Sequence, residues 1–167
     1  MAELTCDLFV SADGYAAGDN TEAFFGYDGP DLRAWIASAS HYRVLVGRNT
    51  YETFPDLAAA VYSNTLTSAG SARLLSGDLA RAVTALKAGS DGPIRTIGSL
   101  RLVAGLLAAG LVDHLRLMVF PVTMGVDGRE HIELPRVGYE LAGSRVLDGR
   151  LVLLDYRPGT VGPAAAS

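Results

Sequence analysis

Short apolar segments alternate along this chain with stretches in which apolar residues recur every three or four positions. Residues 4–10 carry apolar side chains at every second position, and the triplet Val44-Leu45-Val46 is fully apolar. Alternation and short apolar runs both predict strands. The strands expected before the C-terminal region cover residues 4–10, 43–46, 59–63, 73–75, 94–97 and 115–119.

Amphipathic helices are expected between these strands. They cover residues 31–40, 49–54, 79–88 and 100–109. Asp78 is a favourable N-cap for the third helix, and Gly89 and Gly110 are typical residues beyond a helix C-terminus. Pro55 ends the short second helix.

The C-terminal region contains a hairpin signal. Residues 139–147 and 151–156 flank Asp148-Gly149, a pair typical of two-residue hairpin turns. Strand–helix alternation followed by a hairpin predicts a three-layer α/β/α fold, whose mostly parallel central sheet has an antiparallel C-terminal edge. With 167 residues, 49% of them hydrophobic, we expect a single domain over residues 1–158 and a flexible tail over 159–167.

Composition argues against several classes of protein. The formal net charge is −4 and no basic stripe is present, so nucleic acid is not an expected partner. No metal site is expected, because the three histidines are far apart. Cys6 alternates with apolar residues, which favours a core position over a nucleophile. The longest apolar run is too short to span a bilayer, so we expect a cytoplasmic protein without a membrane partner.

Candidate binding chemistry lies where two predicted strands lead into helices. The first junction is Gly47-Arg48-Asn49-Thr50 and the second is Gly98-Ser99. Glycine permits close approach of a ligand, helix-start N–H groups attract anions, and a guanidinium suits phosphate. Because such sheets bind ligands beyond the carboxyl ends of their strands, both junctions are candidates for one extended phosphorylated ligand. The alternative for the first is an ordinary strand–turn–helix with a surface arginine.

Four motifs, in this order, resemble the dihydrofolate-reductase-like superfamily. They are Ser11-x-Asp13-Gly14, Gly47-Arg48-x-Thr50-Tyr51-Glu52, Tyr62-Ser63-x-Thr65-Leu66 and Gly98-Ser99. Residues 110–125 resemble in particular its riboflavin-biosynthesis reductase branch, the RibD C-terminal domain family. The resemblance implies a dihydrofolate-reductase-like fold, NADPH as hydride donor and, commonly, a homodimer.

The resemblance also implies roles for individual residues. Gly47, Arg48 and Thr50 would bind the cofactor, with Arg48 near the ribose 2′-phosphate. Ser63 would lie beside the adenosine half, and Gly98 and Ser99 would face the pyrophosphate. Asp13 and Gly14 would belong to a loop that borders the nicotinamide and the substrate. Two alternatives stay open, since Ser63 is also typical of a turn cap and Asp13 of a turn that bonds nearby backbone.

Asp31 is the one candidate catalytic residue. It lies in the first turn of the predicted helix, as the catalytic carboxylate of dihydrofolate reductases does, where it would bind a pterin-like edge and help supply a proton. The alternative is a helix cap, which an aspartate at a helix start also favours.

Two departures from the family pattern limit the assignment. Asn64 stands where the family often has a basic residue, which leaves the preference for NADPH over NADH open. Residues 126–131 are acidic rather than apolar. No lysine or arginine lies between Arg48 and Arg73. This argues against a folate substrate, because folate reductases hold its glutamate carboxylate with an arginine from that stretch.

Together these features predict an NADPH-dependent oxidoreductase acting on a small heteroaromatic substrate that is pterin-, flavin- or pyrimidine-like. The alternative is a non-catalytic nucleotide- or flavin-binding module with a regulatory or scaffold role.

Overall fold

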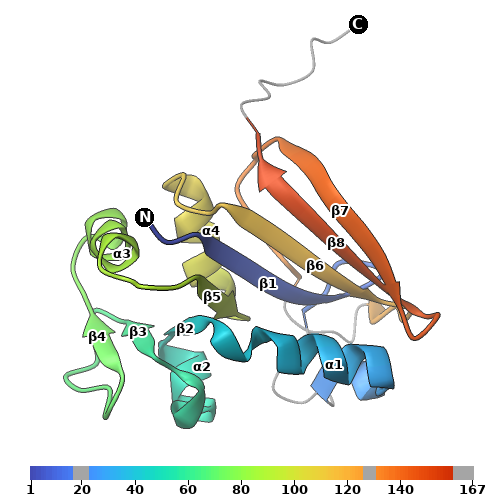
Figure 1. The fold of residues 1–167 in the computed structure, drawn as a ribbon, viewed down its shortest axis with the longest axis horizontal. Helices are drawn as coiled ribbons and strands as arrows, with labels where there is room; N and C mark the ends of the chain where they lie inside the picture. The colour runs from blue at the N-terminus through green and yellow to red at the C-terminus, as the bar shows by residue number, and fades with distance from the viewer. Residues whose placement is uncertain (17–22, 126–130, 160–167) are drawn as a thin grey trace, which may run out of the picture.

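The computed structural model describes residues 1–16, 23–125 and 131–159. The described strands form one sheet (Figure 1) in the order β4-β3-β2-β5-β1-β6-β8-β7. They are β1 (Leu4–Ser11), β2 (Arg43–Gly47), β3 (Ala60–Tyr62), β4 (Arg73–Leu75), β5 (Ile94–Ile97), β6 (His114–Phe120), β7 (Tyr139–Leu147) and β8 (Leu151–Pro158). Most of the predicted flexible tail, residues 160–167, lies outside the described residues.

The sheet has the predicted mixture of pairings. All neighbours from β4 to β6 are parallel, whereas β8 is antiparallel to β6 and β7 is antiparallel to β8. Between β7 and β8, Asp148 and Gly149 have φ angles of 52° and 65°. Two successive positive φ angles are those of a type I′ hairpin turn, so the hairpin prediction is confirmed.

Helices cover both faces of the sheet. They are α1 (Pro30–Ser38), α2 (Arg48–Thr53), α3 (Leu79–Ala88) and α4 (Leu100–Ala108). Single turns of 3-10 helix cover Ala39–His41 and Pro55–Leu57, and Ala23–Gly26 forms a turn in which Phe24 and Phe25 have positive φ angles. Figure 1 shows α1 in front of the sheet and α4 behind it. The predicted three-layer α/β/α arrangement is therefore confirmed.

Alternate residues of β1 face the two helical layers. Leu4, Cys6 and Leu8 belong to the cluster that packs against α3 and α4. Leu32 and Trp35 of α1 belong to the cluster on the other face. The Cys6 side chain is fully buried, and this burial raises the pKa of its thiol to about 12. The prediction that Cys6 is a core residue is confirmed, and a thiol this basic is a poor nucleophile at neutral pH.

None of the helices formed by the described residues is long and apolar enough to cross a membrane. Within the same residues, no group of three or more histidine, cysteine and acidic side chains is arranged to hold a metal ion.

Candidate active site

The two strand–helix junctions singled out in the sequence lie side by side. β2 and β5 are parallel neighbours, so Gly47 and Gly98 end at the same edge of the sheet. The Ser99 hydroxyl accepts the Gly47 N–H at 3.0 Å and lies 2.9 Å from Thr50 Oγ1. One side chain thus holds the start of α2 against the start of α4.

The backbone at the second junction needs glycine, and at the first it does not. Gly98 and Ser99 have φ angles of 61° and 55°, in the left-handed region that favours glycine. Gly47 has an ordinary φ of −83°, and a Cβ built there would lie 3.6 Å from Ser99 Oγ. A methyl group at Gly47 would therefore make only ordinary van der Waals contacts, so packing inside the protein does not require glycine there.

The helices that begin at this edge have no side-chain cap. Neither α2 nor α4 has a side-chain hydrogen bond at its N-cap. By contrast, Asp78 accepts the Arg81 N–H at 2.8 Å at the start of α3. Backbone N–H groups of the first helical turn have no partner within the helix. No side chain or carbonyl among the described residues accepts the first N–H groups of α4, so these can bind an anion, and those of α2 lie beside them.

Arg48 lies between α2 and the turn after β3. Its Nε donates to Glu52 Oε1 at 2.8 Å and its Nη1 to Thr65 Oγ1 at 3.1 Å, and about half of its side chain is exposed. Ser63 is 7% exposed, and its Oγ accepts the N–H groups of Thr65 and Leu66. Ser63 thus caps the turn that carries Thr65, which is the alternative role given for this residue above.

Asn64 stabilises the end of β3. Its Oδ1 accepts the Gly77 N–H at 2.6 Å, and its Nδ2 donates to the Tyr62 hydroxyl at 3.2 Å. Asn64, which stands where the family often has a basic residue, therefore links the end of β3 to the turn before α3.

Asp13 joins two loops at the carboxyl end of β1. Its carboxylate accepts the Ser11 hydroxyl at 2.6 Å and the N–H groups of Met124 and Gly125 at 3.0 and 2.9 Å. These bonds, the Ser11 hydroxyl first, lower the pKa of Asp13 to about 2. The expected backbone bond is therefore present, but to the loop after β6 rather than to the turn of Asp13 itself.

His131 lies against the same loop. A Cβ at Gly14 would be 3.2 Å from His131 Nε2, and the rings of His131 and Tyr15 meet edge-to-face with centroids 5.1 Å apart. The Ile132 N–H donates to the Gly14 carbonyl at 3.0 Å. No sequence signal connects His131 with Gly14, because a bridge between distant segments brings them together.

Asp31 takes part in a contact between α1 and the β7–β8 turn. Its Oδ2 accepts the Asp148 N–H at 2.8 Å, and the Asp148 carboxylate accepts the N–H groups of Asp31 and Leu32 at 2.9 and 3.0 Å. The helix-cap alternative for Asp31 is corrected here, because Asp148 caps α1 and Asp31 instead caps the hairpin turn. The catalytic role of Asp31 stays a prediction.

Comparison with solved structures supports the fold. A protein from Shewanella sp. PV-4 named for riboflavin biosynthesis superposes with a TM-score of 0.71 at 22% identity, covering 95% of this chain and 99% of that one. Acinetobacter baumannii RibD gives a TM-score of 0.68 at 15% identity, covering 95% of this chain and 58% of the longer RibD chain. A pyrimidine reductase-like protein of Corynebacterium diphtheriae gives 0.67 at 15% identity, covering 96% and 93%.

At these identities the likeness establishes the fold alone, which is dihydrofolate-reductase-like. Comparison with curated protein sequences gives no match. The family model described as RibD C-terminal domain, however, matches residues 2–153. Since this match spans nearly the whole chain, the protein belongs to the RibD C-terminal domain family.

Proposed function

We propose that this protein is an NAD(P)H-dependent reductase of a small heteroaromatic substrate that is pterin-, flavin- or pyrimidine-like. The observation that carries the proposal is the pair of uncapped helix N-termini, α2 and α4, side by side with Arg48 at one edge of the sheet. Main-chain N–H groups and a helix dipole favour a pyrophosphate, and a guanidinium favours a ribose phosphate. Membership in the RibD C-terminal domain family supports a reductase-type role.

The donor set suits the phosphates of a dinucleotide. The first turn of α4 offers N–H groups, while the Ser99 hydroxyl is already bonded to Gly47 and Thr50 and so positions the two junctions. When bound, a nicotinamide supplies the hydride, and the protein has to place it and route a proton. Arg48, already hydrogen-bonded to Thr65, is the proposed ligand of the 2′-phosphate.

The substrate side of the site is proposed around Asp13 and Gly14. Asp13 orders this loop, and His131 and Tyr15 lie against Gly14. The lack of lysine or arginine between Arg48 and Arg73 favours a substrate without a carboxylate tail. His131 joins Asp31 as a candidate for the proton-bearing group.

Arg48→Ala tests the cofactor assignment. We expect it to weaken NADPH binding by about 1.5–3 kcal/mol, the usual contribution of a hydrogen bond to a charged group. NADH, which has no 2′-phosphate, should lose much less. Titration followed by the change in NADPH fluorescence measures both affinities. Arg157→Ala is the matched control, because Arg157 is an exposed arginine on β8, away from this edge. Equal losses for the two cofactors would refute the assignment.

Asp31→Asn separates a catalytic role from a structural one. The asparagine carbonyl still accepts the Asp148 N–H, so the contact between α1 and the hairpin should remain. If Asp31 helps supply the proton, NADPH oxidation with a pterin or pyrimidine acceptor falls while cofactor affinity and thermal midpoint stay near wild type. Wild-type turnover in this variant excludes the role and leaves His131 as the candidate.

A nucleotide- or flavin-binding module without turnover is the second candidate. The bond between Asp31 and the hairpin turn favours it, because that bond occupies one carboxylate oxygen of the proposed catalytic group. Cofactor affinity without NADPH oxidation by any pterin, flavin or pyrimidine would support this candidate.

The homodimer and the cytoplasmic location stay predictions. β7 is an edge strand of the sheet, and its Leu141 and Val146 side chains are 59% and 61% exposed. An edge strand with exposed apolar residues is a common pairing surface, which supports a second copy of the chain as partner.

A further inference from the structure

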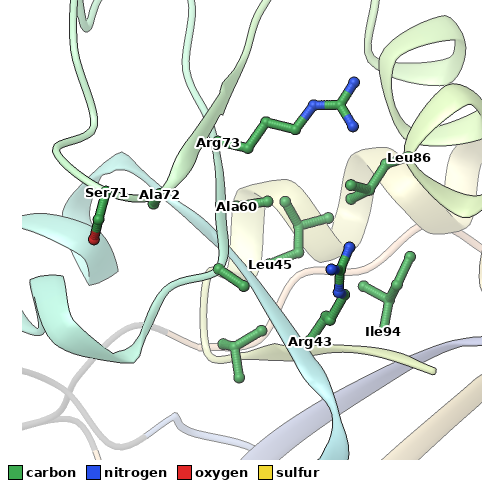
Figure 2. Close-up of a pocket in the computed structure, with 10 residues that line it drawn as sticks. Arg43, Leu45, Ala60, Ser71, Ala72, Arg73, Leu86 and Ile94 are labelled. Atoms are coloured by element: carbon green, nitrogen blue, oxygen red, sulfur yellow. The ribbon is translucent and has the colours of Figure 1, made fainter. Parts of the chain in front are cut away.

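A hollow separate from the candidate active site lies at the opposite end of the parallel strands. It has a volume of about 290 Å³ and is lined by residues at the amino ends of β2, β3, β4 and β5. Leu86 of α3 closes one side (Figure 2). Gly47 and Gly98, at the carboxyl ends of β2 and β5, lie at the other end.

The hollow exists because a small residue lies between larger ones. Across β2, β3 and β4, Leu45 is in register with Ala60, and Ala60 with Arg73. The methyl group of Ala60 leaves space between its two neighbours. Leu45, Ala60, Leu86 and Ile94 form the apolar floor of the hollow, and because each is at most 5% exposed, this floor offers a ligand only a small contact area.

Two arginines border this floor. Arg43 and Arg73 are both exposed, and Figure 2 shows both side chains extending toward the Leu86 side of the hollow. Their strands, β2 and β4, are separated only by β3, hence by about 10 Å, which is within reach of two arginine side chains approaching one ligand.

Neither arginine has an acidic partner in the part of the chain that the structure describes. No ion pair among the described residues includes Arg43 or Arg73, and none of the lining residues is acidic. Two neighbouring guanidinium groups repel each other unless an anion lies between them. This concentration of positive charge contrasts with the net charge of −4 of the chain.

We propose that the hollow bordered by Arg43 and Arg73 binds a small organic anion, a carboxylate or a phosphate monoester. The anionic group would bind between the two guanidinium forks, which match such oxygens in a bidentate manner. The apolar part would cover Ala60 and its neighbours. The volume is at the lower limit of small-molecule pockets, so it suits a ligand no larger than a single substituted ring.

Titration of the full-length protein with phenyl phosphate and benzoate tests the proposal. Inorganic phosphate and benzyl alcohol serve as probes of the charge alone and of the ring alone. Amide chemical shifts should change at Ala60, Leu86 and Ile94 with the two aromatic anions, which should bind more tightly than either partial probe. The tighter of the two anions identifies the preferred head group.

Three variants locate the site. Arg43→Gln and Arg73→Gln should each weaken binding roughly tenfold or more, because each removes charge-assisted hydrogen bonds. Ala60→Leu should abolish binding by filling the hollow. Arg157→Gln is the matched control and should leave affinity unchanged. Because both arginines are exposed, their variants should fold even if Ala60→Leu does not, and thermal unfolding verifies this.

Several outcomes would overturn the proposal. Absence of binding at millimolar probe excludes the site. Binding that Arg43→Gln and Arg73→Gln leave unchanged but Arg48→Ala removes, or that NADPH displaces competitively, places the anion at the other end of the strands. The proposed reductase function stands or falls separately, because Arg48 and Ser99 do not line this hollow.

Discussion

The carboxylate of Asp13 holds together two loops that the proposed substrate would meet. It accepts one hydroxyl and two backbone N–H groups, from Ser11, Met124 and Gly125. These donors bind the ionised carboxylate more strongly than the protonated acid, which is why its pKa falls from 3.8 to about 2. Protonation of Asp13 therefore weakens the link between the loops after β1 and β6.

Asp13→Asn should change how the free energy of unfolding depends on pH. A carboxyl whose pKa is lower in the folded protein stabilises it above the unfolded pKa of 3.8, and this stabilisation is lost as the pH falls toward about 2. The variant should therefore be less stable than wild type at neutral pH, and the difference should shrink between these two values. Urea unfolding at a series of pH values measures this.

Asp56→Asn is the control for this prediction, since Asp56 is exposed and has no side-chain hydrogen bond among the described residues. A stability difference between Asp13→Asn and wild type that does not vary with pH would contradict the argument.

At the scale of elements, α1 and the β7–β8 hairpin stabilise each other's ends. Asp148 lies in the hairpin turn, and its carboxylate accepts the N–H groups of Asp31 and Leu32, 117 and 116 positions away in the sequence. Asp31 returns one bond to the Asp148 N–H. Gly29, the N-cap residue of α1, has no side chain to supply this cap.

Asp148→Gly should destabilise the protein by about 0.5–2 kcal/mol, the usual cost of losing a helix cap. Glycine keeps the positive φ of 52° at no steric cost, so the turn itself should remain. Asp148→Asn, which also tolerates this φ and keeps one acceptor oxygen, should lose less. Urea unfolding compares the two variants. An equal loss in both would mean that the negative charge, rather than the hydrogen bonds, stabilises α1.

Local signals explain why most elements, and not their contacts, were predictable from sequence. Asp78 and Gly89 mark both ends of α3, and Asp148-Gly149 marks the hairpin, because capping and turn preferences act within a few residues. The bond between Asp31 and Asp148 joins distant segments, so the first turn of α1 read in isolation suggested a local cap.

The candidate site was predictable to a similar extent. The adjacency of Gly47 and Gly98 followed from strand order, which parallel α/β topology limits strongly. The contacts of Asn64 with Gly77 and of His131 with Gly14 depend on loop paths that no periodic pattern encodes. The burial of Asp7 in β1 was not predictable either, since a polar residue that alternates with apolar ones is typical of an exposed strand face. In a parallel sheet covered on both faces, that position is buried.

At the scale of the whole molecule, Asp7 joins three strands and a helix. Its carboxylate pairs with Arg95 of β5 and with Arg116 of β6, the latter through Nε and Nη2 at 2.6 and 2.8 Å. Asp7 is 1% exposed and Arg95 is 4% exposed. Both guanidinium groups lie over the ring of Trp35 in α1, at 4.8 and 5.3 Å from its centroid. The layer between α1 and the sheet thus contains one buried cation, Arg95, and one partly buried cation, Arg116, that share one anion.

Asp7→Ala should therefore be among the most destabilising single changes in this protein. It leaves Arg95 and Arg116 without their shared anion, and removing one partner of a buried pair costs about 3–5 kcal/mol. Asp28→Ala is the matched control, because the Asp28–Arg33 pair has side chains that are 69% and 61% exposed and should contribute less than about 1 kcal/mol. Urea unfolding of both variants gives the comparison. α1 packs on this cluster and also contacts the hairpin. Loss of Asp7 should therefore lower the urea midpoint of a single cooperative transition and should not unfold α1 separately. Similar losses in the two variants would mean that water reaches the cluster and screens its charges.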